Sequence, residues 1–518
     1  VTPVSVFAEN MATALGLGLA IDYSLFLVTR YREELAGGYS TEEAVRRTVD
    51  SAGRTVAGSA LTVAGALAAM AIFPIVFLRS FAYAGVAVAL LAGLAAVLVV
   101  PALLGALGPN INRWTVRRQA IEVRDEGFWS ATAQRVMRHP VLVILGTLAL
   151  LLGLAAPFTH LHLGSTDYRV LPPGNAVRAV TDDVVDTIGV GQTQPIEVVV
   201  PDLFEPAGSA ARAEVIDRYA SELSHLSGVH YVAAATGVFI HGFHLSAPAA
   251  YLSQFDNRRG TWLSVVPQGN ALNQSGSQLV DAIRASPSPG TILVGGSPAE
   301  FVDSTNVISH DLPFVLLLIG LLSFIVLFAM FKSVLIALKA VILSALSLSA
   351  MFGAMVWVFQ DGHFSTLLDF TAIGNLSATT PVLMFCIAFG LSMDYEVFLI
   401  SRIKEHHDAG YSDEQAVAMG LQRSGRIVTA AALLISVVFL GQVLSPISAT
   451  KVFGLGVSLA VLMDAFVVRA LLVPALMRVA GRANWWAPRW LVGPPRVRDA
   501  KESAPEPALG WLGVPAGS

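Results

Sequence analysis

Residues 390–402 read Gly-Leu-Ser-Met-Asp-Tyr-Glu-Val-Phe-Leu-Ile-Ser-Arg, which places Asp394 and Tyr395 inside a run apolar enough to cross a membrane. A related stretch at 20–27, Ala-Ile-Asp-Tyr-Ser-Leu-Phe-Leu, places Asp22 and Tyr23 in a second such run. An ionised aspartate at the centre of a membrane costs about 2.5–3.5 kcal/mol even on insertion scales, so such residues usually serve a function. The two pairs therefore favour proton carriage. The alternative is that each aspartate is only a buried hydrogen-bonding strut.

The composition is that of an integral membrane protein. Charged residues make up 14% of the 518-residue chain, against about 25% in soluble domains, and hydrophobic residues reach 54%. The formal net charge is −4 and no dense basic stripe is present, which argues against a nucleic-acid partner. The single cysteine, Cys386, cannot form an internal disulfide, so redox chemistry is not indicated.

Hydropathy predicts about nine membrane-spanning helices. They are Met11–Val28, Thr55–Leu78, Phe81–Leu107, Pro140–Phe158, Leu312–Phe331, Val334–Phe359, Pro381–Ser401, Ile427–Leu444 and Val452–Met477. Between the fourth and the fifth lies a polar block of about 150 residues, long enough to fold as a domain. Two strand–helix–strand halves in this block predict a ferredoxin-like split βαβ fold.

The basic residues predict an orientation in the membrane. Arginine and lysine gather in the loops between spans one and two, three and four, and seven and eight. All these loops fall on one side if the first span runs from outside to inside, and the positive-inside rule makes that side cytoplasmic. The polar domain is then expected to be extracytoplasmic.

The two Asp-Tyr segments belong to a long internal repeat with a constant offset of 372 residues. Gly18 and Gly390 lie four residues before the two aspartates, on the same helix face, which predicts that the Asp-Tyr helices pack closely together. Because adjacent helical residues point about 100° apart, each tyrosine is expected to reach toward the opposite repeat. Capping-box patterns at 40–43 and 412–415 predict a short amphipathic helix on the cytoplasmic face after each Asp-Tyr helix. Further identical positions are Phe26 and Phe398, Arg30 and Arg402, Glu33 and Glu405, and Arg54 and Arg426.

These motifs resemble the mycobacterial membrane protein large (MmpL) family of the resistance-nodulation-division (RND) superfamily. The resemblance rests on 390–402, Arg-Tyr-Arg-Glu-Glu at 30–34, Ala-Gly-Arg at 52–54, Leu-Met-Asp-Ala-Phe-Val-Val-Arg at 462–469 and Asn-Trp-Trp-Ala-Pro-Arg-Trp-Leu at 484–491. It implies a proton-driven exporter of lipids or lipid-like molecules in an actinobacterial cell (inner) membrane. A complete member has twelve spans and two extracytoplasmic porter domains. The resemblance also implies that Asp22, Tyr23, Asp394 and Tyr395 form the proton relay.

Relative to a complete duplication of the repeat, this chain lacks its first third. It is therefore expected to be N-terminally truncated. The expected organisation is a remnant of the first transmembrane half (1–107), a cytoplasmic linker (108–139), a transmembrane helix (140–158), an extracytoplasmic porter domain (159–311), a five-helix second transmembrane half (312–480), and an interfacial anchor with a disordered cytoplasmic tail (481–518). Trp485, Trp486 and Trp490 are expected to form that anchor.

Asp464 and Arg469 form a further charged pair in the last span. Five residues apart, they are poorly placed for the i, i+4 pairing that would neutralise both within one helix. A relay role and a structural ion pair with other helices both stay open. Arg469 is alternatively expected to extend its guanidinium toward the cytoplasm.

No cofactor, metal or enzymatic activity is indicated. His160 and His162, with His241 and His244, lack the cysteine or carboxylate cluster of a metal site and are interpreted as surface residues. No glycine precedes a lysine, so the phosphate-binding Gly-Lys-Ser/Thr motif is missing, and no Gly-x-Ser-x-Gly elbow occurs.

Two functions remain. One is proton-motive-force-driven export of a lipid or another amphiphile, which the paired membrane carboxylates favour. The other is a truncated non-transporting membrane module, or a scaffold for another exporter, which the missing opening third favours. Expected partners are lipid, protons and the membrane, with a homo-oligomer or accessory proteins left open.

Overall fold

The computed structural model describes residues 5–113, 127–165, 167–246, 250–257 and 259–488. The rest of the expected linker (114–126) and tail (489–518) lie outside the described residues. The helices are α1 (Val6–Ala36), α2 (Thr41–Thr48), α3 (Arg54–Ala68), α4 (Val76–Leu107), α5 (Phe128–Arg138), α6 (Pro140–Ala155), α7 (Ala176–Ile188), α8 (Ala210–Ser224), α9 (Gln274–Ala285), α10 (Ser297–Phe331), α11 (Val334–Met355), α12 (Ser365–Leu368), α13 (Thr379–Asp408), α14 (Asp413–Leu440), α15 (Ser448–Met463) and α16 (Val473–Ala480). The strands are β1 (Leu163–Gly164), β2 (Ile196–Val200), β3 (Val229–Ala234), β4 (Gly237–Ile240), β5 (Phe243–Ser246), β6 (Thr261–Pro267), β7 (Leu293–Gly295) and β8 (Leu376–Ser377).

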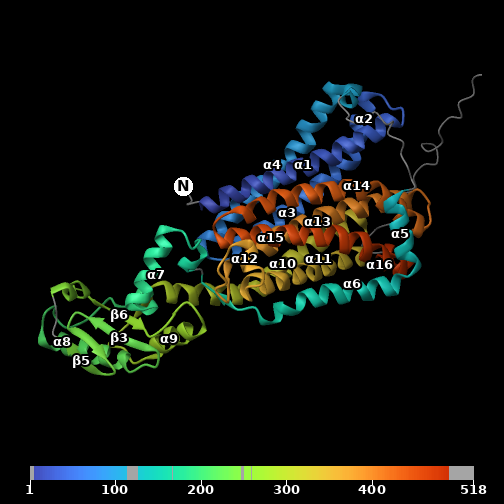
Figure 1. The fold of residues 1–518 in the computed structure, drawn as a ribbon. Helices are drawn as coiled ribbons and strands as arrows, with labels where there is room; N and C mark the ends of the chain where they lie inside the picture. Colours follow the sequence, from blue (N-terminus) through green and yellow to red (C-terminus); the bar gives the residue numbers. More distant parts are fainter. Residues whose placement is uncertain (1–4, 114–126, 166, 247–249, 258, 489–518) are drawn as a thin grey trace, which may run out of the picture.

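A helical bundle carries a small sheet domain at one end (Figure 1). Nine helical segments in the described residues are long and apolar enough to cross a membrane, which confirms a polytopic helical membrane protein. The helices α2 and α5 and the turn between α13 and α14 lie at the end away from the sheet domain, which we call the basic end because Arg46, Arg47, Arg135 and Arg138 lie there.

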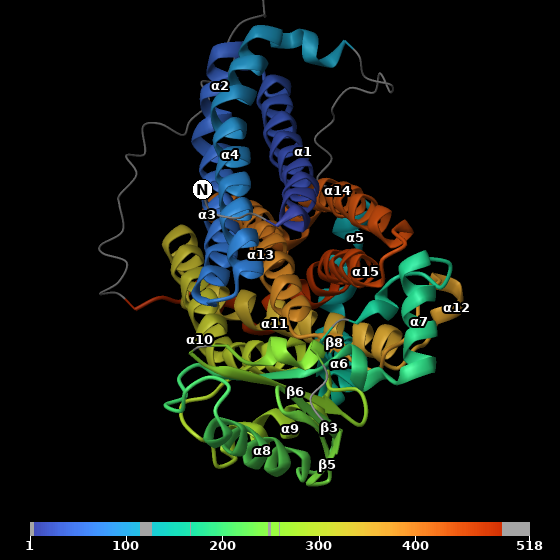
Figure 2. The ribbon, with the colours of Figure 1, turned by 90° about the vertical axis from the view of Figure 1, so that its left-hand side faces the viewer.

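The helix α13 is the centre of the bundle. Almost all of its apolar stretch is buried, whereas α4, α6 and α10 leave most of theirs exposed, as expected for helices that face lipid. In Figure 2, α13 lies between the α1–α3–α4 group and the α10, α11 and α15 group. It packs on α3 and α14, while α1 packs on α4 and α14.

Two boundary predictions differ from the structure. The predicted second span ran to Leu78, but the helix ends at Ile72 and α4 begins at Val76, so Leu78 belongs to the next helix. The capping signals at Ser40 and Ser412 are real, because each side chain accepts the amide of the third residue that follows. In the first repeat the cap opens the short helix α2, which a π-helical segment joins to α3, as predicted in part. In the second repeat the prediction of a separate short helix is wrong, because α14 continues from its cap into the apolar span without a break.

The sheet domain has the predicted ferredoxin-like arrangement. Its antiparallel sheet has the order β5-β4-β3-β6-β2-β7. The two interleaved βαβ halves are β2-α8-β3 and β6-α9-β7. The hairpin β4–β5, which extends one edge of the sheet, and α7 were not predicted.

The continuous helix α10 joins the sheet domain to the bundle: Ala299 and Val302 are buried in the core of the sheet domain, and Phe331 is buried in the bundle. On the bundle itself, β1, which follows α6, pairs in parallel with β8, which leads into α13. Arg178 of α7 strengthens it by donating to the Thr371 hydroxyl at 3.0 Å.

Candidate functional site

The two Asp-Tyr pairs meet inside the bundle, and each tyrosine crosses to the other repeat. The Tyr395 hydroxyl donates to Asp22 Oδ2 at 2.7 Å, and the Tyr23 hydroxyl donates to Asp394 Oδ2 at 3.2 Å. All four side chains are buried. The prediction that each tyrosine reaches the opposite repeat is confirmed.

The repeat forms a local two-fold arrangement around these contacts. Phe26 and Phe398, which are equivalent positions, lie with their ring centroids 4.2 Å apart. A Cβ atom on Gly18 would lie 3.3 Å from Ile435 of α14, and one on Gly390 would lie 3.4 Å from Val63 of α3. Val63 and Ile435 are also separated by the repeat offset. Gly18 and Gly390 therefore allow α14 and α3 to pack closely against the Asp-Tyr helices. The prediction that these glycines bring the two Asp-Tyr helices against each other was wrong.

The two halves of the site differ in their polar surroundings. Ser59 donates to the Tyr23 hydroxyl at 3.3 Å, whereas the equivalent position in the second repeat is Ala431. A cavity of about 10 Å³ lies instead beside Asp22 and Tyr395, lined in part by Ala431. This is close to the smallest volume that holds one water molecule. The Oδ1 atoms of Asp22 and Asp394 have no hydrogen-bond partner among the described residues.

The pair Asp464 and Arg469 corrects the sequence analysis. The segment Asp464–Leu472 is π-helical, so residues five apart face the same side and the two charged groups lie 2.5 Å apart. Both are 2% exposed, which excludes a guanidinium extended to the membrane surface. Arg469 also donates to the carbonyl of Ser392 and lies 5.2 Å from the centre of the Tyr395 ring. A buried ion pair therefore borders the Asp-Tyr contacts.

Toward the basic end, four charged residues repeat the two-fold pattern. Arg30 contacts Glu405 at 3.1 Å, and the equivalent pair Arg402 and Glu33 is 2.9 Å apart. The sequence repeat showed that an arginine and a glutamate recur at the same offset. It did not show that each arginine pairs with the glutamate of the other repeat.

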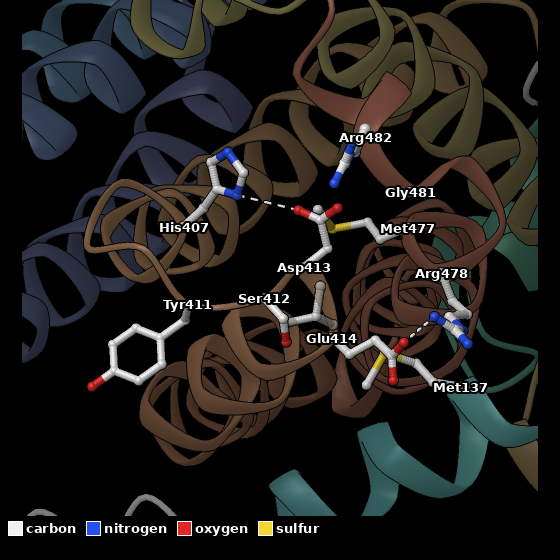
Figure 3. Close-up of a pocket in the computed structure, with 11 residues that line it drawn as sticks. Met137, His407, Tyr411, Ser412, Asp413, Glu414, Met477, Arg478, Gly481 and Arg482 are labelled. Carbon is white, nitrogen blue, oxygen red and sulfur yellow. Dashed lines mark hydrogen bonds and ion pairs between the residues drawn. The ribbon is translucent and has the colours of Figure 1, made fainter.

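Trp485, predicted as part of an interfacial anchor, packs against other side chains at the basic end. Its ring stacks on His407 with centroids 4.2 Å apart, and its indole nitrogen donates to Asp413 at 3.1 Å. His407 and Asp413 line a cavity of about 400 Å³ at the basic end together with Arg478 and Arg482 (Figure 3). Trp486 is exposed, and Trp490 lies outside the described residues.

The four histidines lie in two different places in the structure. His160 contacts Asp361 at 3.3 Å at the domain end of α6, where the backbone of His162 donates to Gln360. In the hairpin of the sheet domain, His241 has a positive φ and His244 stacks on Phe239. Within the described part of the chain, no group of three or more His, Cys, Asp and Glu side chains is placed to hold a metal ion.

The chain is similar to bacterial lipid exporters. It is 35% identical to the trehalose monomycolate exporter MmpL3 of Mycobacterium tuberculosis, over 94% of this chain and 54% of that protein. It is 32% identical to the mycolic acid-containing lipids exporter MmpL11 of Mycolicibacterium smegmatis, over 95% and 50%. The chain spans about half the length of these curated relatives.

Among solved structures, the fold is similar to that of SecDF, a translocon-associated membrane protein from Thermus thermophilus. The TM-score is 0.52 at 16% identity, over 91% of this chain and 54% of that one. At this identity the likeness shows the fold alone. The sequence model of the MMPL family matches residues 1–143 and 170–508, and with these relatives it establishes that the chain belongs to the MMPL family.

Proposed function

We propose that this protein exports lipids or lipid-like amphiphiles across the cell membrane, driven by the proton gradient, with Asp22, Tyr23, Asp394 and Tyr395 as the proton relay. The crossed Tyr–Asp contacts carry the proposal, because they place two buried carboxyl groups and two hydroxyl groups at the contact between the repeats. The names of the mycobacterial relatives support a lipid as the transported molecule.

The geometry provides a means of coupling. A carboxylate accepts a strong hydrogen bond from a phenol, and this bond weakens when the carboxyl group takes up a proton. Each crossed bond joins α1 to α13, so a proton on Asp22 or Asp394 changes the interaction between the two repeats. Arg469 and Asp464 form a buried ion pair beside these contacts.

The export proposal is tested by following lipids in cells that carry the native gene or a deletion of it. Lipids labelled with radioactive acetate should accumulate in the outer layer of the envelope, and deletion should reduce at least one class severalfold. An uncoupler should stop that accumulation within minutes, because a relay has no driving force without a proton gradient. An unchanged lipid profile in the deletion strain, or export that persists after uncoupling, would contradict the proposal.

We further propose that the sheet domain is extracytoplasmic and the basic end cytoplasmic, because Arg46, Arg47, Arg135 and Arg138 lie at the end away from that domain. In a background in which the buried Cys386 is Ser, Ser275→Cys in α9 should react with a membrane-impermeant thiol reagent on intact spheroplasts. Gln134→Cys in α5 should react only after the membrane is opened. Both positions are exposed, so accessibility alone does not separate them. The reverse labelling pattern would overturn the orientation.

A further inference from the structure

A cavity of about 400 Å³ opens at the basic end of the bundle, apart from the crossed Asp-Tyr contacts (Figure 3). Its walls come from the end of α13, the start of α14, the end of α16 and one residue of α5, Met137. His407, on the α13 wall, lies about 20 Å further along that helix than Asp394. The proposed relay therefore makes no use of this cavity.

The charges that line the cavity are unequally compensated. Asp413 lies 3.1 Å from the imidazole of His407, and Glu414 forms an ion pair with Arg478. The exposed Arg482 has no hydrogen-bond or ion-pair partner within the part of the chain that the structure describes. In Figure 3 its side chain points into the cavity. The cavity therefore presents one free guanidinium, which favours an anion as its ligand.

The two arginines are not required by the fold, because the first repeat lacks them. The helix α4 ends at Gly108 as α16 ends at Gly481: each glycine has a positive φ, and its amide donates to the carbonyl four residues earlier. Counted from these glycines, the residues of the first repeat that correspond to the two arginines are Gly105 and Pro109. The same type of helix end thus forms without either arginine.

The cavity also has an apolar lining that borders a lipid-facing surface. Met137, Val417 and Met477 belong to this lining and are buried. Next to it, Val479 of α16 is 59% exposed, and Leu142 of α6, which packs on α16, is 73% exposed. Exposed aliphatic side chains on membrane-spanning helices face lipid chains. A ligand with an anionic head and apolar tails can therefore place its head in the cavity and its tails along α6 and α16.

We propose that this cavity binds the headgroup of an anionic membrane phospholipid, with the phosphate on Arg482 and the acyl chains along α6 and α16. A guanidinium forms two parallel hydrogen bonds with a phosphate, and the donors of Arg482 are free for this among the described residues. A soluble phosphate ester offers the same anionic group, but it leaves the apolar lining and the lipid-facing surface unused. The bound phospholipid joins the ends of α13 and α16 to the start of α14, at a site separate from the proposed relay.

The ligand class is tested by calorimetry with the purified 518-residue protein in a neutral detergent. Dioctanoyl-phosphatidylglycerol should bind saturably at one site. Dioctanoyl-phosphatidylcholine has the same chains and no net charge, and it should bind at least about fivefold more weakly. Glycerol 3-phosphate lacks the chains and should bind at least about tenfold more weakly. Equal binding of the phosphatidylcholine would contradict recognition of the charge, and equal binding of glycerol 3-phosphate would assign the cavity to a soluble phosphate and overturn the lipid proposal.

Arg482→Gln should weaken the binding of dioctanoyl-phosphatidylglycerol at least about fivefold, because it removes the free guanidinium. Arg54→Gln is the matched control, since Arg54 is exposed where α3 begins, next to α2 at the basic end, and does not line the cavity. Both substitutions are at exposed positions, so the melting temperature without lipid should stay at the wild-type value.

A second pair of variants changes the charge in the opposite direction. Glu414→Gln releases Arg478 from its ion pair, so it should strengthen the binding of dioctanoyl-phosphatidylglycerol severalfold. Glu42→Gln, at the equivalent position of the first repeat, should leave the affinity unchanged. Unchanged affinity in both Arg482→Gln and Glu414→Gln, or an equal change in their controls, would overturn the inference. None of these outcomes bears on the proposed function, which is tested by lipid export.

Discussion

Asp394→Asn is expected to abolish lipid export while the protein remains in the membrane at its normal amount. An asparagine has nearly the same shape, and its side-chain oxygen can still accept the hydrogen bond that Tyr23 donates. It cannot take up or release a proton, so a relay through this position stops. The measurement is the accumulation of acetate-labelled lipid in the outer layer of the envelope, with immunoblots of the same membranes.

Asp22→Asn should have the same effect, because Asp22 holds the equivalent contact with Tyr395. Asp408→Asn is the matched control, because Asp408 lies at the end of the same helix as Asp394, is half-exposed and forms an ion pair with Lys404. If the Asp394→Asn protein exports nearly as much lipid as the Asp408→Asn protein, the relay assignment is wrong. Asp22 and Asp394 would then serve only as hydrogen-bonding groups that fix the packing of the helices.

Arg469→Met is expected to destabilise the protein more than any other removal of a single charge. It leaves Asp464 buried without its partner, and breaking a buried ion pair in this way costs about 3–5 kcal/mol. The double variant Asp464→Asn/Arg469→Met removes both charges and should recover most of the loss. The apparent melting temperature of detergent-purified protein, followed by tryptophan fluorescence, is the measurement.

Arg138→Met provides the comparison for that series, because Arg138 is exposed at the end of α5 and surface substitutions usually stay within about 0.5 kcal/mol. A double variant that melts as low as Arg469→Met would show that the arginine acts through its contact with the Ser392 carbonyl, and not through Asp464.

The crossed contacts could be predicted from the sequence because they follow from symmetry. A repeat with one offset implies two similar helices, and the 100° step between an aspartate and the next tyrosine turns the two side chains toward different neighbours. The contact of Asp464 with Arg469 could not be predicted, since it depends on a π-helical segment that no residue pattern announces.

The membrane spans followed from long apolar runs, but the ends of the helices did not. A cap such as Ser412 marks where a helix begins and carries no information on how far it continues, so the start of α14 was interpreted as a separate short helix. Trp485 shows the same limit: tryptophan next to a span is common at the lipid interface, and only the folded chain places His407 and Asp413 against its ring.

The continuous helix α10 has a mechanical consequence. Its 35 residues form a lever about 50 Å long, with one arm in the sheet domain and the other in the bundle. A tilt of about 5° at the bundle would displace the far arm by about 4 Å. The pairing of β1 with β8 adds a link at this end of the bundle, because β8 leads into α13, the helix that carries Asp394. A shift of α13 would therefore move the segment from which the chain enters the sheet domain, while a tilt of α10 would move the domain itself.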